Sequence, residues 1–142
     1  MSFSLQAGDS EAIQVMTGEN LVLRLRAYDP SGIIRIFVEC FQFSTASTNK
    51  AKFATSEIEI PLQESFSRNT FDVPVPIPDN AALGKWGVRL VEFTNGRGFK
   101  VSFYRGQGKF DEIIFEVTPP PSKGDELLHF NGVEIAGDGR LL

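Results

Sequence analysis

The segment Phe71–Pro78 limits most strictly what this chain can fold into. Apolar side chains at every second position alternate there with an aspartate and three prolines, in the order Phe-Asp-Val-Pro-Val-Pro-Ile-Pro. A period of two predicts a half-buried β-strand. Proline has no N–H to donate to a sheet ladder, so this strand is expected at a sheet edge, where the prolines discourage further pairing.

The same alternation recurs along the chain, whereas helical periodicity is nearly absent. Strands are expected at residues 12–16, 21–28, 33–43, 57–62, 71–77, 84–93, 99–104 and 110–117. The side chains expected to point inward are Leu21, Leu23, Leu25 and Ala27; Ile34, Ile36, Val38 and Cys40; Ile58, Ile60 and Leu62; and Trp86, Val88 and Leu90. Trp86 is therefore expected in the core rather than on a carbohydrate-binding surface.

Short strands separated by turn signals at this spacing are typical of a β-sandwich. We expect an all-β, immunoglobulin-like β-sandwich of seven to eight mostly antiparallel strands in two sheets. A chain of 142 residues fits one domain and can bury a core without disulfides or metal. The one cysteine, Cys40, excludes an internal disulfide and is expected to be inert core packing.

The composition divides the chain into three parts. Residues 1–118 form the expected sandwich, and residues 119–122 form a proline-rich linker. The tail, residues 123–142, contains two short apolar runs around Asn131-Gly132, a pattern that predicts a two-residue β-hairpin. Two such strands are marginal alone, so the tail is expected to dock on another surface or to begin a second module.

Three motifs add to this pattern. They are the turn Asp29-Pro30-Ser31-Gly32-Ile33, the strand Gly84-Lys85-Trp86-Gly87-Val88 with its following Asn95-Gly96, and the last strand Ile114-Phe115-Glu116-Val117. Together they resemble the bacterial immunoglobulin-like, or fibronectin-III-like, modules, over about residues 12 to 117. The resemblance implies a spacer, adhesion or accessory domain of surface and secreted proteins.

Several functional classes have little support in the sequence. No signal peptide or membrane-spanning run is visible, so the expected location is the cytoplasm for a full-length chain and the cell surface or exterior for an excised module. A net charge of −4 argues against nucleic acid as a partner, and membrane insertion is not expected. One cysteine and one histidine, His129, do not suffice for a zinc site, and no D-x-D-x-D-G calcium loop occurs. No metal or cofactor is predicted.

The segment Thr94–Phe110 is the first candidate site, because it carries four basic residues, with Phe99, Phe103 and Tyr104 interleaved among them, and no acid. Such a mixture can bind anions, glycans or single-stranded nucleic acid; the alternative is a solvated hairpin. In an immunoglobulin-like topology the turn 29–32 is expected to lie beside this segment. The candidate binding residues are Asp29, Ser31, Asn95, Arg97, Phe99, Lys100, Tyr104, Arg105 and Lys109.

A second candidate surface is the outward face of the strand 33–43, which carries Phe37, Phe41 and Phe43. Exposed aromatic side chains in a row suggest a partner interface. The alternative is that the loop Ser44–Lys52 or the C-terminal tail covers them.

These observations lead to two predicted functions. The first is a non-catalytic module that binds a protein partner or a neighbouring domain, through its loops or its tail, or that spaces domains within a larger assembly. The second is a carbohydrate-binding accessory module of an exported enzyme. The chain is predicted not to be an enzyme, because no nucleophile, base or marked carboxylate pair is evident.

Overall fold

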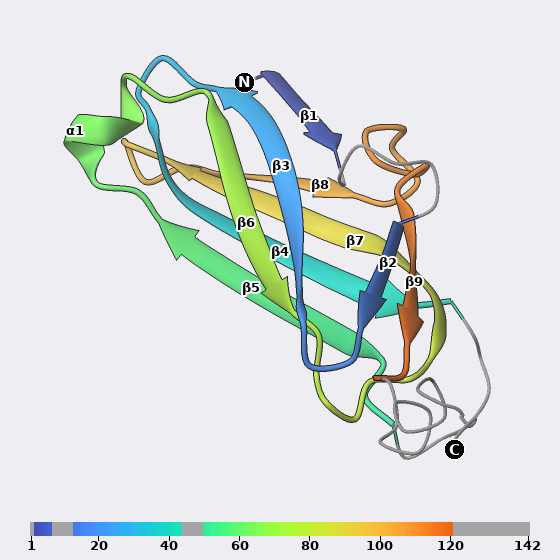
Figure 1. Cartoon of the computed structure of the whole chain (residues 1–142). Coiled ribbons are helices and arrows are strands. Elements are labelled where there is room, and N and C mark those ends of the chain that lie inside the picture. The colour runs from blue at the N-terminus through green and yellow to red at the C-terminus, as the bar shows by residue number, and fades with distance from the viewer. Residues whose placement is uncertain (1, 7–12, 44–49, 121–142) are drawn as a thin grey trace, which may run out of the picture.

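The computed structural model describes residues 2–6, 13–43 and 50–120, and these ranges form two β-sheets that face each other (Figure 1). The three-stranded sheet has the order β1-β3-β6, and its strands are β1 (Ser2–Gln6), β3 (Asn20–Tyr28) and β6 (Thr70–Pro76). The six-stranded sheet has the order β2-β9-β7-β4-β5, with β8 also beside β7. Its strands are β2 (Ile13–Met16), β4 (Ile33–Gln42), β5 (Phe53–Glu59), β7 (Gly84–Asn95), β8 (Lys100–Tyr104) and β9 (Ile114–Thr118). The predicted all-β sandwich is confirmed.

The described ranges contain nine strands, one more than the eight expected from the sequence. The additional strand is β1, which pairs with β3. The pairs are antiparallel apart from β2 and β9, which run parallel. A short helix, α1 (Leu62–Ser65), connects β5 to the segment before β6. The N-terminal part of the chain thus contributes β1 to one sheet and β2 to the other.

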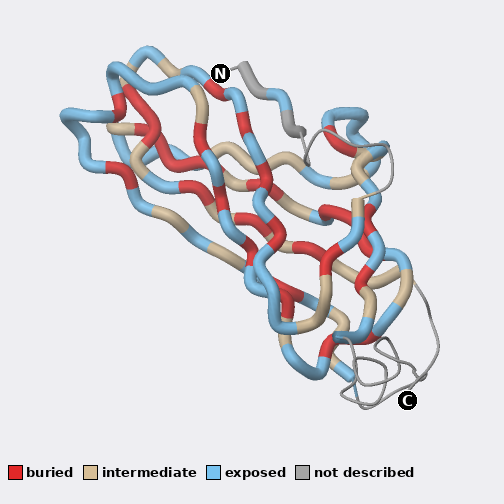
Figure 2. The backbone as a smooth tube through the Cα atoms, viewed as in Figure 1, coloured by how far each residue is buried: buried red, intermediate tan, exposed pale blue. Residues whose placement is uncertain are grey.

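The three-stranded sheet follows the predicted alternation closely. Every second side chain of β3 and β6 is buried, and Figure 2 shows the alternation along both strands. The proline-rich strand β6 lies at the edge of this sheet, as predicted. The Ser56 hydroxyl of β5 donates to the Pro74 carbonyl oxygen of β6, so this edge is joined to the neighbouring edge of the six-stranded sheet.

Two predicted inward positions are wrong because the register of β4 against β7 shifts twice. The first shift, between Ile33 and Arg35, buries Ile33 in place of Ile34. The second, where Glu39 faces Leu90 and Cys40 faces Val88, buries Val91 in place of Leu90. A β-bulge adds one residue to a strand and moves the following side chains to the opposite face.

Leu62 is also misplaced in the prediction, since 49% of it is exposed. The strand β5 ends at Glu59, and Pro61 then precedes the helical turn that contains Leu62. Proline interrupts the sheet ladder, and the alternation therefore does not continue past it.

The core lies between the sheets and contains Trp86 and Cys40, as predicted. The Trp86 Nε1–H donates to the Ala82 carbonyl oxygen at 2.7 Å, which satisfies the polar atom of this fully buried ring. Burial raises the pKa of the Cys40 thiol to about 12, with a smaller contribution from the charge of Glu39. A thiol in this state is a poor nucleophile.

The last predicted strand begins later than expected, at Ile114. Phe110 belongs to the preceding loop, where its buried ring joins the core. Ala12, most of the loop 44–52, the linker after Pro120 and the predicted tail hairpin lie outside the described residues. In the described part of the chain, no helix has the length and apolar character that a membrane span requires.

Candidate functional site

The turn 29–32 and the turn after β7 lie together, as the sequence predicted. The Gly96 N–H donates to the Gly32 carbonyl oxygen at 3.0 Å. A Cβ on Gly96 would collide with the carbonyl oxygen of Ser31 and would lie 3.0 Å from Leu62 Cδ1. We call this surface, made by residues 29–32, α1 and residues 95–99, the loop end; Figure 1 shows α1 beside the neighbouring loops.

The polar side chains of the loop end hold its own turns together. The Asp29 carboxylate accepts hydrogen bonds from the Ser31 N–H at 2.9 Å and from the Ser31 hydroxyl at 2.7 Å. The Ser31 hydroxyl is the main reason that the pKa of Asp29 lies below its ordinary value. Asn95 Oδ1 accepts from the N–H groups of Arg97 and Phe99, both at 3.0 Å. Three predicted binding residues are thereby engaged in local turn structure.

Three further candidates at or next to the loop end are exposed, namely Arg97, Phe99 and Lys100. Phe99 is 60% exposed, and the Arg97 guanidinium lies 5.4 Å from the centre of its ring. Lys100 Nζ lies 4.0 Å from Glu92 Oε1. These three candidates therefore form one arginine–aromatic pair at the loop end and, next to it, a lysine that faces an acid.

The remaining three candidates lie elsewhere, which corrects the predicted single cluster. The strand β8 runs antiparallel to β7, and Tyr104 pairs with Leu90 instead of with the loop end. Leu90 is five residues before Asn95, so Tyr104 lies about 17 Å along the sheet from the loop end. Arg105 and Lys109 follow it in the loop between β8 and β9. A binding role for any of the nine residues stays a prediction.

An aromatic surface crosses the outer face of the six-stranded sheet. One row of paired residues runs over four strands, from Phe53 of β5 through Phe41 and Gly87 to Ile114 of β9. Phe53 is 56% exposed and Ile114 is 43% exposed. With Phe43 and Arg105, which lie over Gly87, these residues form what we call the aromatic face.

Arg105 lies at the centre of the aromatic face. Its guanidinium is 4.7 Å from the centre of the Phe43 ring and 5.8 Å from that of Phe41. Its Nη1 donates to the Val88 carbonyl oxygen at 3.2 Å, and its Nη2 donates to the Asp111 carbonyl oxygen at 2.7 Å. A Cβ on Gly87 would approach Arg105 Nη1 and Phe43 Cζ to 2.7 Å each. The glycine thus makes room for both side chains.

Sequence reasoning found part of this face and missed the rest. It identified Phe41 and Phe43, but it assigned Arg105 to the loop cluster and did not include Phe53, Gly87 or Ile114. Cross-strand register brings these residues together, and no spacing within one strand carries that information. Among the described residues, Arg105 covers part of this face; the predicted cover by the loop Ser44–Lys52 or by the tail involves segments that lie mostly outside the described residues and stays a prediction.

Between the aromatic face and the loop end, the same sheet face carries charged side chains that pair with one another, and Phe37, also predicted to face outward, lies among them opposite Glu57 and Glu92. Arg35 forms ion pairs with Glu57 and Glu59, and the Glu39 carboxylate accepts from Arg89. Glu92 accepts a hydrogen bond from the Ser102 hydroxyl at 3.0 Å. These pairs lie between the aromatic face and the loop end. No group of three or more potential metal-ligating side chains occurs within residues 2–6, 13–43 and 50–120.

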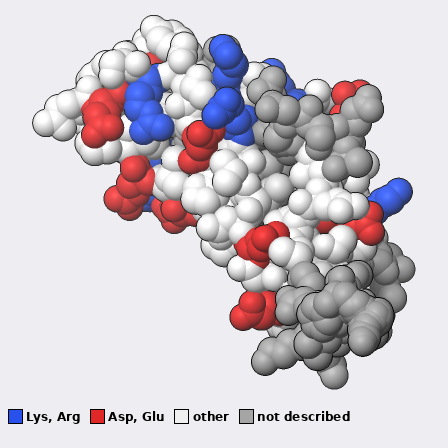
Figure 3. Space-filling model, viewed as in Figure 1, with Lys and Arg blue, Asp and Glu red and all other residues white. Residues whose placement is uncertain are grey.

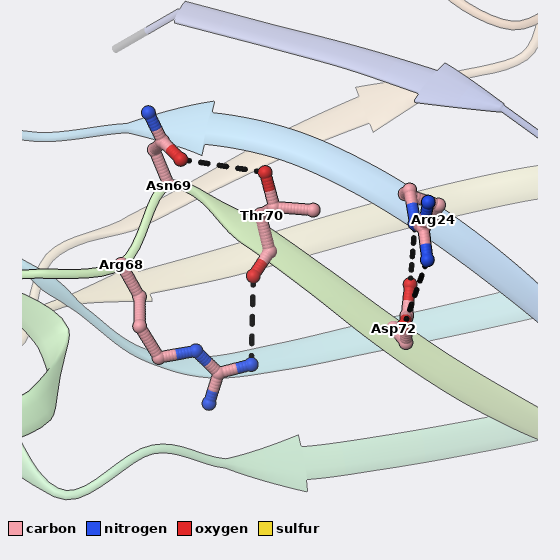
Figure 4. Close-up of polar contacts among 5 residues, drawn as sticks. All are labelled: Arg24, Arg68, Asn69, Thr70 and Asp72. Atoms are coloured by element: carbon pink, nitrogen blue, oxygen red, sulfur yellow. Dashed lines mark hydrogen bonds and ion pairs between the residues drawn. The ribbon is translucent and has the colours of Figure 1, made fainter.

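The outer face of the three-stranded sheet is polar. Arg24 of β3 forms a two-point ion pair with Asp72 of β6, and Arg68 reaches the Thr70 carbonyl oxygen (Figure 4). Figure 3 looks onto this sheet and shows basic side chains gathered in its upper part with acidic side chains around them. The Arg24 guanidinium lowers the pKa of Asp72. This face has the character of a solvated surface.

Comparisons with known proteins include a match to a solved structure. No protein-family model matches the chain, and no curated protein matches it. Among solved structures, the search finds a lytic polysaccharide monooxygenase from Kitasatospora papulosa, at 9% identity and a TM-score of 0.44. The match covers 82% of this chain and 55% of that chain. It contradicts the prediction that the chain is not an enzyme, because the matched protein is an enzyme.

Proposed function

We propose that this chain is a binding module that takes a protein partner on its aromatic face. The observation that carries the proposal is the cross-strand row Phe53–Phe41–Gly87–Ile114, with Arg105 laid over its centre. Aromatic residues and arginine are enriched in the cores of protein interfaces and among the residues whose truncation most weakens binding.

The surroundings of the row also fit a protein interface. The charged residues beside it are already paired, for example Arg35 with Glu57 and Arg89 with Glu39. A polar rim of this kind adds little affinity itself but excludes water from an apolar centre. The partner is therefore expected to offer an apolar surface that fits between the exposed ring of Phe53 and the exposed aliphatic side chain of Ile114.

The geometry favours a protein over a glycan. Sugars stack on aromatic rings that present their flat faces to solvent, whereas the rings of Phe41 and Phe43 are inclined at 85° to each other. The Arg105 donors nearest to them are directed at backbone carbonyl oxygens of the same chain. The site thus offers neither a coplanar stacking platform nor ready donors for sugar hydroxyls.

The test compares two side chains of similar exposure on opposite outer faces. Phe53 is 56% exposed on the six-stranded sheet, and Val22 is 50% exposed on the three-stranded sheet. We expect Phe53→Ala to lose proteins that the wild-type chain captures, and Val22→Ala to retain them. With the purified partner, calorimetry should show Kd raised by about tenfold or more for Phe53→Ala.

Equal binding by wild type and Phe53→Ala would remove the aromatic face from the interface. A polysaccharide array that binds the wild-type chain but not Phe53→Ala would instead support the carbohydrate-binding alternative. The thermal midpoints of both variants, measured in parallel, show that each chain is folded.

A further inference from the structure

The sequence after the sandwich predicts a hairpin with one apolar side. In a two-residue hairpin centred on Asn131-Gly132, Phe130 pairs with Val133 and Leu128 pairs with Ile135. Paired residues, and residues two positions apart along a strand, share a face. The four residues therefore form one apolar side, and His129 and Glu134 lie opposite. Such a hairpin is marginal in water unless its apolar side is covered.

The chain leaves the sandwich at the end where the aromatic face lies. Pro120 follows β9, and the row residue Ile114 is six residues before Pro120 on the same strand and its extension. Phe53 lies three strands across the sheet from β9. These offsets correspond to about 25 Å between Pro120 and Phe53. Leu128 and Phe130, eight and ten residues beyond Pro120, can span about 26–33 Å in extended form.

Charge is also favourable for this contact. The segment 121–142 contains four acidic and two basic residues, and Asp125-Glu126 immediately precede the hairpin. Arg105 at the centre of the aromatic face donates to carbonyl oxygens in the described part of the chain, so its positive charge is not directed at a carboxylate there. Lys109 of the same loop lies with its Nζ 5.8 Å from the centre of the Phe103 ring, which packs against the core, so Arg105 supplies the positive charge of this face.

We propose that residues 127–136 of the same chain dock on the aromatic face, with Leu128, Phe130, Val133 and Ile135 against Phe41, Phe53 and Ile114. The docked hairpin competes with a protein partner for this face. The competition rests on the proposed function, whereas the docking itself does not. The tail then acts as an internal occupant that a partner must displace.

The experiment uses the purified chain of residues 1–142 without a partner, so its failure is separate from a failure of the proposed function. A photo-crosslinking phenylalanine analogue, benzoylphenylalanine, replaces Phe53, and a second sample carries it at Val22 on the opposite sheet. After irradiation, mass spectrometry of the monomer band should find residue 53 joined to a peptide from 121–142. Position 22 should give no such product.

Matched tail substitutions test the predicted apolar side. Phe130→Asp should reduce the crosslink from position 53 by about tenfold or more, since it removes the burial of one aromatic ring. His129→Asp, on the opposite side of the hairpin, should leave the crosslink nearly unchanged. A crosslink in a dimer band would assign the face to a second copy. Three results would each overturn the proposal: a crosslink found in a dimer band, no crosslink to the tail, or equal effects of the two substitutions.

Discussion

The loop end and the aromatic face contain residues of similar chemistry, yet the structure uses them differently. At the loop end, Asp29 and Asn95 accept hydrogen bonds from the backbone of their own turns. On the aromatic face, Phe53 projects from a strand into solvent, and Arg105 lies over Gly87. At the loop end, the polar side chains are used in hydrogen bonds that stabilise the turns themselves. On the aromatic face, the sheet backbone sets the geometry and the apolar side chains remain available for contact.

The difference shows why residue type alone located the site poorly. Asp, Ser and Asn are common both in binding loops and in tight turns, because the same oxygens that bind ligands also accept backbone N–H groups. A side chain that holds its own turn is less free to hold a partner. Gly96 in the loop end and Gly87 in the aromatic face allow the difference to be measured.

The largest expected effect is that of Gly96→Ala on stability. The added methyl group would collide with the Ser31 carbonyl oxygen, a backbone atom that cannot rotate away. Overpacking of this kind costs about 1–3 kcal/mol. In Gly87→Ala the methyl meets Arg105 Nη1 and Phe43 Cζ, the ends of two side chains that can move. Urea unfolding at 25 °C should therefore show a clear loss of stability for Gly96→Ala and a smaller one for Gly87→Ala.

Partner binding should reverse this order. Gly87→Ala displaces the guanidinium and the Phe43 ring from the aromatic face and should weaken binding, whereas Gly96→Ala alters a region far from it. Equal unfolding midpoints for the two variants would contradict the rigid contact between the turns at the loop end.

The second effect in size concerns two arginines that each lie over an aromatic ring. Arg105→Ala removes hydrogen bonds to the carbonyl oxygens of Val88 and Asp111, and we expect it to cost about 1–3 kcal/mol. Arg97→Ala removes a contact with the exposed ring of Phe99, worth about 0.5–1 kcal/mol. Thermal unfolding of both variants gives the comparison.

Arg105→Lys is the control for charge. A lysine keeps the positive charge but cannot direct two fixed donors at two carbonyl oxygens. Arg105→Lys should therefore lose most of the stability that Arg105→Ala loses. Full recovery by lysine would mean that charge over the rings matters more than the hydrogen bonds.

The sequence predicted the sandwich because its evidence is local. Alternation identified β3 and the edge strand β6, and the turn at Asp29 follows from the properties of Pro30 and Gly32. The errors at Ile34 and Leu90 arise at bulges, where pairing with another strand decides which side chain turns inward. Bulges leave little local signal.

The candidate site was harder to predict for the same reason. The loop end required only that two turns meet, which the topology of the sandwich supplies. The aromatic face required the register of β5, β4, β7 and β9 at once, together with a loop that returns Arg105 over Gly87. Arg105, which is close to Arg97 in sequence, was therefore assigned to the loop cluster, although it lies on the aromatic face.

The smallest expected effect concerns acid and the loop end. The pKa of Asp29 is lowered from 3.8, chiefly by the Ser31 hydroxyl. A lowered pKa in the folded chain means that this carboxylate contributes stability above pH 3.8 and that the contribution is lost as pH falls through the folded value. In Asp29→Asn the acid dependence of unfolding below that pH should be shallower, while the amide oxygen still accepts from the Ser31 N–H.

Salt separates this carboxylate from Asp72, whose pKa is lowered chiefly by its hydrogen bond to the charged Arg24. At 1 M salt the screening length is about 3 Å, so the Arg24–Asp72 attraction weakens and the pKa of Asp72 should move back towards its ordinary value. The pKa of Asp29 should hardly change, since the Ser31 hydroxyl is uncharged. Carboxyl NMR titrations at low and high salt measure both residues in one sample. A salt response of Asp29 as large as that of Asp72 would show that a charged group, rather than its own turn, holds this carboxylate.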